Sequence, residues 1–249
     1  MKILLLNPNT TTALTDIMVS AAREVTGPDT EIIPLTAPRG VPYISTHAEA
    51  QLGGGIVLEM LAENHDRADA AIIAAFGDPG LLGARELFDI PIVGLAEGAM
   101  LTACMLGRKF SIITFARALG TWYKDCVEMH GLSGRLASIR ALDDQFKDVS
   151  NVQNEMEHLL VDLTARAIAE DGADVIILGG APLSGMAWKV ADRIQVPVID
   201  QVAAAVKQAE ALVALRSRKA QIGSFRRPTQ KKTIGISPAL ARRIEHADI

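Results

Sequence analysis

The sequence predicts an α/β fold with two similar Rossmann-like domains, whose parallel sheets are related by a pseudo-twofold, and an active site in the interdomain cleft. Short apolar segments alternate with helical patterns along the chain, as in parallel sheets covered by helices. Hydrophobic residues make up 49% of the 249 residues but aromatic residues only 4%, so the core is mainly aliphatic, as in buried parallel sheets. Finally, the alternation begins again in the second half.

That internal repeat is clearest in two segments, ADAAIIAAFGDPG and ADVIILGGAPLSG. They align Asp69 with Asp174 and Gly80 with Gly185, and the later segments DIPIVG and QVPVID also correspond. The offset between the two copies stays near 105 to 107 residues. We therefore predict a first domain of residues 1–97 plus about 205–249 and a second domain of residues 98–204.

In the first half, the predicted strands alternate with helices. The strands are expected at 3–6, 30–38, 70–76 and 90–94, and the helices at about 10–25, 46–65, 79–88 and 95–106. Asn9, Thr10 or Thr11 is expected to cap the first of these helices. Asp78 is expected to cap the third, with Pro79 at its first position. Three glycines in the middle of the second helix weaken its pattern without removing it.

The second half repeats the order. The strands are expected at 109–115, 136–142, 174–180 and 196–200, and the helices at 116–131, 152–172, 184–194 and 201–215. From about Ser217 the tail is predicted to cross back over the first domain.

Charge and cysteine content exclude several classes of function. With a net charge of -4 and no basic stripe, the chain is not expected to bind nucleic acid. No apolar segment approaches the roughly 20 residues of a membrane span, so no membrane association is expected. The two cysteines and the scattered histidines (His65, His130, His158, His246) show no metal-ligand spacing. We therefore expect a cytoplasmic protein without a metal.

Four loops follow predicted strands and should meet in the cleft: NPNTT, AFGDPG, TFARA and GGAPLSG. In parallel sheets, ligands bind at the carboxyl ends of the strands. The helix N-termini that follow these loops favour anionic groups. The sequence therefore predicts a small anionic or enolisable ligand between the two domains.

The motifs LLLNPNTT, IIAAFGDPGLLGARELFDIPIVGLAEGAM, FSIITFA and DVIILGGAPLSGMA carry a family resemblance over nearly the whole chain. The chain resembles the aspartate/glutamate/hydantoin racemase superfamily, and most closely its hydantoin and allantoin racemase branch. The resemblance implies a cofactor-independent isomerase that moves a proton at a carbon next to a carbonyl. Family racemases use two facing cysteines, and their positions correspond here to Ala75 and Gly180. Both thiols are therefore missing.

The remaining family positions imply a retained pocket. Its expected substrate-binding residues are Asn9, Ser45, Ala75, Phe76, Thr114, Gly180, Ala181 and Pro182. Asn9 resembles a ligand-binding asparagine, and Thr114 resembles the hydroxyl that receives a substrate carboxylate or carbonyl. The two cysteines of this chain, Cys104 and Cys126, lie inside predicted helices and are interpreted as buried structural residues.

Two side chains are candidates for the missing acid–base chemistry. Histidine side chains in general can act as acid or base at physiological pH. His47 lies in a region that crosses the cleft in relatives, although a surface position at a helix start is the alternative. Asp78 could act as a base, although helix capping also explains it. Tyr43 could donate a hydrogen bond to a ligand or stack on it, with packing in the core or in a lid as the alternative. Ser184 is expected to cap a helix.

These observations leave three hypotheses. The first is a hydantoin-racemase-like isomerase acting on a small hydantoin, ureide or carboxylate. The second is a related enzyme that catalyses decarboxylation, elimination or hydrolysis with one proton transfer, by His47 or water. The third is a protein that binds a small ligand without turnover. The hydrophobic helices and the resemblance also imply a homo-oligomer.

Overall fold

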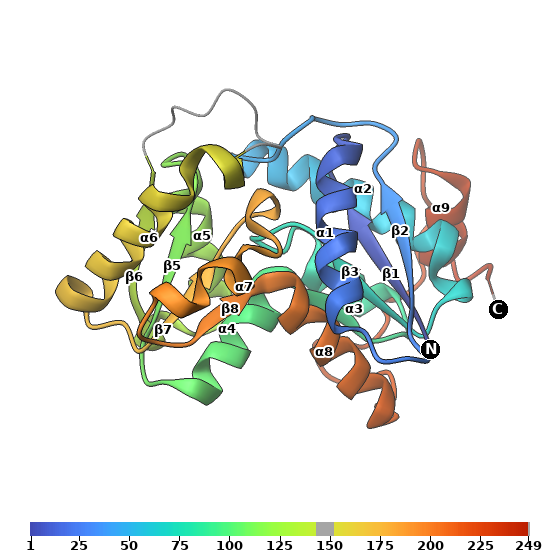
Figure 1. Cartoon of the computed structure of the whole chain (residues 1–249). Helices are drawn as coiled ribbons and strands as arrows, with labels where there is room; N and C mark the ends of the chain where they lie inside the picture. Colours follow the sequence, from blue (N-terminus) through green and yellow to red (C-terminus); the bar gives the residue numbers. More distant parts are fainter. Residues whose placement is uncertain (143–151, 249) are drawn as a thin grey trace.

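The computed structural model describes residues 1–142 and 152–248. Its strands form two four-stranded parallel sheets, with the orders β2-β1-β3-β4 and β6-β5-β7-β8. The strands of the first sheet are β1 (Lys2–Asn7), β2 (Glu31–Thr36), β3 (Ala70–Ile73) and β4 (Ile92–Gly94). Those of the second are β5 (Phe110–Thr114), β6 (Leu136–Ala141), β7 (Val175–Leu178) and β8 (Val198–Asp200). The predicted α/β class with two similar halves is confirmed (Figure 1).

Helices follow the strands in both halves. In the first half they are α1 (Thr12–Val25), α2 (His47–Asn64), α3 (Leu81–Leu87) and α4 (Leu95–Leu106). In the second they are α5 (Leu119–Met129), α6 (Val152–Asp171), α7 (Met186–Val190) and α8 (Gln201–Ala214), and α9 (Pro238–Ile244) follows near the C-terminus. Short 3-10 turns lie at His65–Arg67, Ser133–Arg135, Ala181–Leu183 and Ala191–Arg193. The sequence did not predict α9.

The repeat seen in the sequence is also a repeat of local structure. The Asp69 carboxylate accepts a hydrogen bond from the backbone of Lys2 at the start of β1. The matching Asp174 accepts bonds from the backbone of Arg108 and Lys109 just before β5. Gly80 and Gly185 adopt the same left-handed conformation, with φ of 80° and 81°, immediately before α3 and α7. The aspartate and glycine residues that recur in the two halves of the sequence therefore have matching roles in the backbone structure.

The two halves share one hydrophobic core. A single cluster of buried side chains includes Ile3 and Leu5 of the first sheet and Ile112 and Ile177 of the second. Helix α8 packs against α1 and α4 and also contacts strands of both sheets. Because buried apolar contacts are continuous across the halves, the loops between them are held in a defined arrangement.

The C-terminal tail lies against elements of the first half. Helix α9 packs on α2 (Figure 1). The buried Arg243 donates to the Leu87 carbonyl and pairs with Asp89, while Lys219 donates to the carbonyls of Arg85 and Glu86. These bonds attach the tail to α3 and to the loop that follows it.

Helix α2 is intact despite its three glycines. Its N-terminus has a reciprocal capping box between Thr46 and Glu49. A β-carbon on Gly54 would lie 3.0 Å from the backbone nitrogen of Gly80, and one on Gly53 would lie 2.9 Å from Ile44. Gly53 and Gly54 therefore permit close packing of α2 against neighbouring loops, which offsets their weak helix propensity, whereas a β-carbon on Gly55 would meet nothing within 4 Å.

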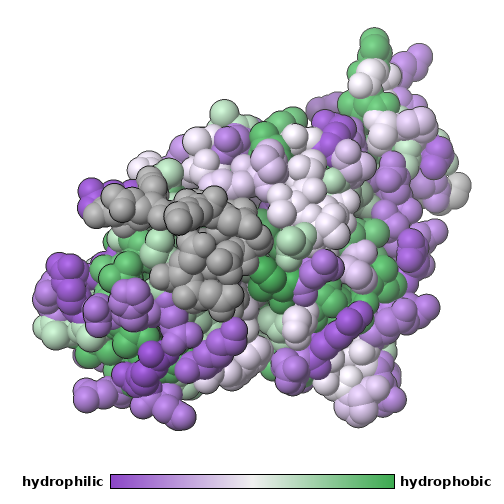
Figure 2. Space-filling model, turned by 45° about the horizontal axis from the view of Figure 1, so that its top comes forward, coloured by the Kyte–Doolittle hydropathy of each residue, from purple (hydrophilic) through white to green (hydrophobic). Residues whose placement is uncertain are grey.

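The surface is mixed in character. On the face shown in Figure 2, hydrophobic residues reach the surface in small areas between hydrophilic ones. Among the described residues, no helix has the length and apolar character needed to cross a membrane.

Candidate active site

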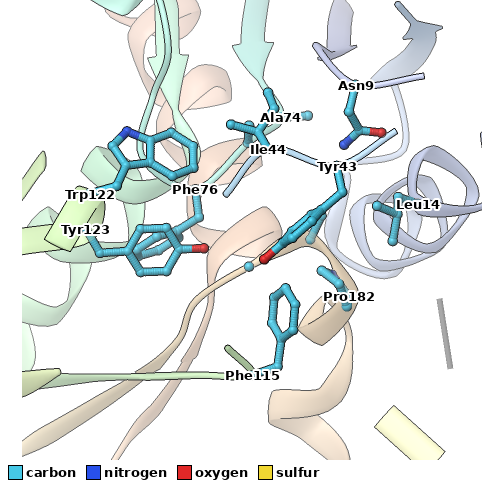
Figure 3. Close-up of a pocket in the computed structure, with 13 residues that line it drawn as sticks. Asn9, Leu14, Tyr43, Ile44, Ala74, Phe76, Phe115, Trp122, Tyr123 and Pro182 are labelled. Carbon is cyan, nitrogen blue, oxygen red and sulfur yellow. The ribbon is translucent and has the colours of Figure 1, made fainter. Parts of the chain in front are cut away.

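A small pocket lies between the two halves, at the carboxyl ends of their strands (Figure 3). Its cavity is about 30 Å³, which is room for one or two water molecules. The described residues that line it are Asn9, Leu14, Tyr43, Ile44, Ala74, Ala75, Phe76, Phe115, Trp122, Tyr123, Gly180, Ala181 and Pro182. The first half contributes α1 and the loops after β1, β2 and β3, and the second contributes α5 and the segments that follow β5 and β7. The pocket is therefore interdomain, as the sequence predicted.

Aromatic side chains dominate the lining. Both tyrosines of the chain, one of its two tryptophans and two of its six phenylalanines line this one pocket. Their rings contact one another, with centroids 4.7 Å apart for Phe76 and Tyr123 and 5.8 Å apart for Tyr43 and Phe115. None of the described lining residues carries a charge. The pocket is therefore suited to an uncharged, flat ligand.

Ala75 and Gly180, the two positions where the family resemblance implies thiols, both line this pocket. Gly180 has φ of 120° and ψ of 136°, a conformation open essentially only to glycine. A β-carbon on Gly180 would lie 2.6 Å from the Phe115 ring and 3.4 Å from the Tyr123 hydroxyl oxygen. The space that a thiol side chain would need is therefore filled by two aromatic residues.

The backbone of Gly180 is held by a buried amide. Gly180 donates its N–H to the Gln201 side-chain oxygen at 2.9 Å, and the Gln201 amide nitrogen donates to the Gly180 carbonyl. Gln201 is completely buried at the start of α8. These two hydrogen bonds hold the backbone at the end of β7 in its unusual conformation.

Asn9 is positioned to donate a hydrogen bond to a ligand. Its carboxamide oxygen accepts bonds from the Thr11 backbone at 2.9 Å and from the Asn7 side chain at 3.1 Å. Those bonds orient the amide, and its nitrogen points toward Tyr43 and the pocket (Figure 3). Asn9 therefore lies in the pocket lining, and its role in ligand binding stays a prediction.

Two tyrosine hydroxyls point toward the same space (Figure 3). Burial raises the pKa of the Tyr123 phenol well above its usual value, with a further contribution from the nearby Tyr43. Tyr123 therefore remains a neutral hydrogen-bond donor across the physiological pH range. The fully buried Thr114 hydroxyl lies near Tyr123 without a hydrogen bond of normal geometry to any described residue.

Not every predicted binding residue is in the lining. Phe76, Ala181 and Pro182 line the pocket. Thr114 lies behind the lining, and Ser45 is engaged elsewhere, because its hydroxyl donates to the Glu49 carboxylate at 2.9 Å at the start of α2.

The structure places His47 outside the pocket. Its side chain is 54% exposed at the first residue of α2. Its imidazole Nε2 lies 3.1 Å from the carboxylate of Asp125 on α5, so the pair bridges the two halves at the surface. The alternative interpretation, a surface histidine at a helix start, describes this position.

The prediction that Asp78 caps its own helix is wrong. Helix α3 begins only at Leu81, and its N-cap residue is Gly80. The buried Asp78 carboxylate instead accepts bonds from the backbone of Ala96 at 2.9 Å and Glu97 at 2.8 Å, so it caps α4. Asp78 adopts a left-handed backbone conformation, with φ of 53°, and it is not among the described residues that line the pocket.

Two features of this region were not evident from the sequence. Phe115, Trp122 and Tyr123 showed no pattern that marks a pocket, since they lie on a strand end and a helix with ordinary spacing. The expectation that the histidines are scattered also needs correction, because His130 lies beside Asp78 and Cys126. Only the position of His130 four residues after Cys126 on one helix face hinted at this cluster.

Comparison with known proteins agrees with this geometry. The family model described as Asp/Glu/Hydantoin racemase matches residues 3–209. A hydantoin racemase from Pseudomonas sp. (strain NS671) is 34% identical over 236 residues, which cover 94% of this chain and 95% of that protein. One from Paenarthrobacter aurescens is 35% identical over 234 residues, which cover 93% and 99%. The structure of an allantoin racemase from Klebsiella pneumoniae superposes with a TM-score of 0.91 at 34% identity and covers 96% of this chain and 98% of that one.

The two-domain fold and its interdomain pocket define a racemase-like isomerase. The chain belongs to the Asp/Glu/Hydantoin racemase family. Within that family it departs at the two positions, Ala75 and Gly180, where thiols are expected.

Proposed function

We propose that this isomerase acts on an uncharged five-membered ring of the hydantoin or ureide class, at the ring carbon next to a carbonyl, without a cofactor. The observation that carries the proposal is the uncharged, aromatic lining of the pocket. A free amino acid or dicarboxylate would bring ionised groups into a site without charged partners, which is costly. A hydantoin ring is flat and neutral, and its carbonyl and N–H groups need only hydrogen bonds. The names of the hydantoin and allantoin racemase relatives agree with this substrate class.

The side chains of the pocket suit the stabilisation of an enolate. Removal of the ring-carbon proton places negative charge on the adjacent carbonyl oxygen. The neutral phenol of Tyr123 and the amide nitrogen of Asn9 can both donate hydrogen bonds to that oxygen. A preorganised donor of this kind typically contributes about 10²–10³-fold in rate.

Ala75 and Gly180 cannot carry the proton itself. We therefore assign proton removal and return to water or hydroxide that enters with the substrate. Return of a proton to either face of the planar enolate gives both enantiomers. Because the cavity is only about 30 Å³, the aromatic side chains around it must move apart before a ring can enter.

The test is proton NMR in deuterated water with single enantiomers of 5-substituted hydantoins, allantoin and glutamate, each with a protein-free control for spontaneous exchange. We expect deuterium at the ring carbon of a hydantoin or allantoin, together with loss of optical rotation, and no exchange of glutamate. A new product without exchange would replace this proposal with decarboxylation, elimination or hydrolysis. Binding without exchange or product would identify a ligand-binding protein.

We further propose that the protein is a homo-oligomer in the cytoplasm. Large apolar side chains are exposed on one end of α4: Leu101, Met105 and Leu106. Both cysteines are free thiols, which a reducing compartment preserves. Light scattering on the wild type and on Met105→Lys would test the assembly, and cell fractionation would test the location.

A further inference from the structure

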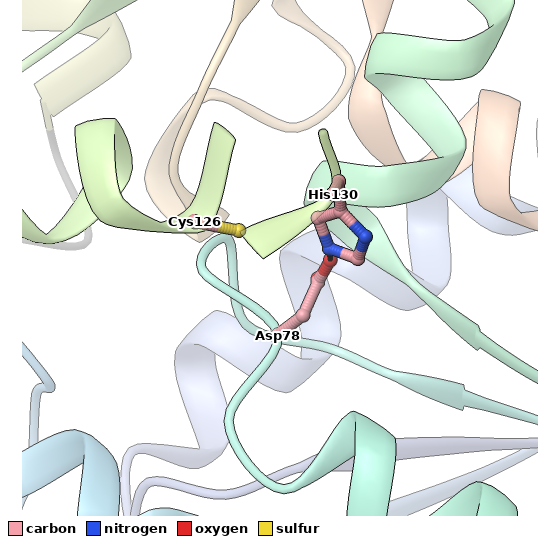
Figure 4. Close-up of side chains that lie close together, drawn as sticks. All are labelled: Asp78, Cys126 and His130. Atoms are coloured by element: carbon pink, nitrogen blue, oxygen red, sulfur yellow. Dashed lines mark hydrogen bonds and ion pairs between the residues drawn. The ribbon is translucent and has the colours of Figure 1, made fainter. Parts of the chain in front are cut away.

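Asp78, Cys126 and His130 each bring one potential ligand atom to a common point outside the pocket, and these atoms lie within 4.8 Å of one another (Figure 4). Asp78 belongs to the loop after β3, whereas Cys126 lies on α5 and His130 caps its end. The side chains of Asp78 and His130 are 0% and 7% exposed, and Cys126 is 4% exposed. This Asp78–Cys126–His130 cluster therefore joins the first half of the chain to the second at a position that is nearly closed to solvent.

The neighbours of the cluster fix its orientation. The Asp78 carboxylate is held by the two backbone N–H groups of α4, and Gly94 makes room for it, since a β-carbon there would lie 2.2 Å from Asp78. His130 presents Nε2 to Asp78 at 3.1 Å and Nδ1 to the Glu97 carboxylate at 3.5 Å. Glu97 is in turn paired with Arg85. A histidine held by a carboxylate on its far nitrogen is the usual arrangement around a metal-ligating imidazole.

The charges around Cys126 favour a cation. Burial, followed by the charges of Asp78 and Glu97, raises the pKa of the Cys126 thiol far above its ordinary value. The same carboxylates that oppose a thiolate there attract a positive ion. A bound divalent ion would reverse the effect on the thiol, because coordination stabilises the thiolate.

We propose that Asp78, Cys126 and His130 form a binding site for a divalent transition metal, for which the mixed O, S and N ligand set favours zinc. The 3.1 Å between Nε2 and the Asp78 oxygen is close to the roughly 3.3 Å expected between two ligands about 2.0–2.1 Å from a tetrahedral ion. On binding, the Cys126 thiol loses its proton to solvent and its sulfur coordinates the metal. The imidazole coordinates through Nε2 and keeps its other proton on Nδ1, toward Glu97. A water molecule would complete four-coordination.

The site has a structural connection to the pocket but does not depend on the proposed function. Trp122, Cys126 and His130 recur every four residues along one face of α5. Trp122 lines the pocket and packs against Gly77, next to Asp78. A metal at the cluster would therefore tie the loop after β3 to the helix that supplies the aromatic wall.

The experiment is titration of the metal-free protein with Co²⁺, which reports thiolate ligation through a near-ultraviolet charge-transfer band and tetrahedral geometry through visible bands. We expect one Co²⁺ per chain, displaced by an equivalent of Zn²⁺. Cys126→Ser should abolish the charge-transfer band, and His130→Gln should weaken Co²⁺ binding at least ~100-fold, beyond the effect of losing an outer partner. Cys104→Ser is the matched control and should leave the titration unchanged.

Three results would overturn the proposal. A wild-type titration without a charge-transfer band shows that the thiol does not ligate, and it requires no variant to fold. A band that persists in Cys126→Ser, or that disappears in Cys104→Ser, places the metal elsewhere. Circular dichroism of each variant separates loss of binding from loss of folding. A Glu97→Gln variant that binds Co²⁺ about tenfold more weakly, with the charge-transfer band retained, would support the orienting role of that carboxylate.

Discussion

The ring of Phe115 stands where a side chain on Gly180 would begin, only 2.6 Å from the ideal β-carbon position. A thiol side chain at position 180 would therefore require more than a change of that one residue. The neighbouring aromatic side chains and the glycine conformation are mutually adjusted, and this packing defines the pocket that a substrate must enter.

Placing a cysteine at position 180 should lower the free energy of unfolding more than placing one at position 75. Gly180→Cys should lower the free energy of unfolding by about 2–4 kcal/mol, because it combines an unfavourable φ with overpacking against Phe115. Ala75→Cys should cost less than about 1.5 kcal/mol, since Ala75 has an ordinary side chain bordering the cavity. Urea unfolding of both variants measures the difference, and equal values would contradict it.

Tyr123→Phe should slow ring-carbon exchange by about 10²–10³-fold, because it removes one hydrogen-bond donor to the enolate. Its free energy of unfolding should change little, since the ring is retained. The exchange rate by NMR and the unfolding curve, measured on the same preparation, check this. An unchanged rate would remove Tyr123 from the mechanism.

The buried thiol of Cys126 should make the metal-free protein sensitive to alkaline pH. Its pKa is raised in the folded state, so above about pH 9 only the unfolded chain releases this proton. The contribution of the Cys126 thiol to the free energy of unfolding is complete below the pKa that this thiol has in the unfolded chain. Above that pKa the contribution falls as pH rises, by up to about 1.4 kcal/mol per pH unit. Urea unfolding with a chelator at about pH 8 to 10 should show this decline. Cys126→Ser should reduce it, whereas Cys104→Ser should not.

Asp78 acts as a structural residue in this geometry. Asp78→Ala should cost about 2–4 kcal/mol, because it leaves the first turn of α4 and the buried His130 without their partner. Asp78→Asn keeps one acceptor oxygen and should cost about half as much. Thermal and urea unfolding test the order. A variant that keeps full stability but loses exchange would instead support the catalytic role predicted from sequence.

His47→Ala should leave the exchange rate within about twofold and the unfolding free energy within about 1 kcal/mol, because an exposed ion pair contributes little. Asp125→Asn removes the same pair from the other side and is the matched control. If only His47→Ala abolishes exchange, the histidine reaches the substrate in a more closed state than this one.

Much of the fold was predictable from local pattern. The strand–helix alternation predicted both sheets, because apolar segments of this length must be buried between helices. Helix α4 lies where its apolar pattern placed it, and Gly80 and Gly185 repeat one left-handed turn. Strand ends were predicted less well, since β3 stops at Ile73 although its apolar run continues to Phe76. Backbone pairing with neighbouring strands, and not hydropathy, ends that strand.

The sequence by itself determined the family, the repeated halves, the cleft between them and the absence of both thiols, because these depend on residue identity and spacing along the chain. Only the tertiary structure decided that Asp78 caps α4 and meets His130, that His47 faces solvent, and that five aromatic rings gather at one pocket. Such contacts join residues far apart in the chain. Their distances depend on how the two halves pack, and no local periodicity encodes that packing.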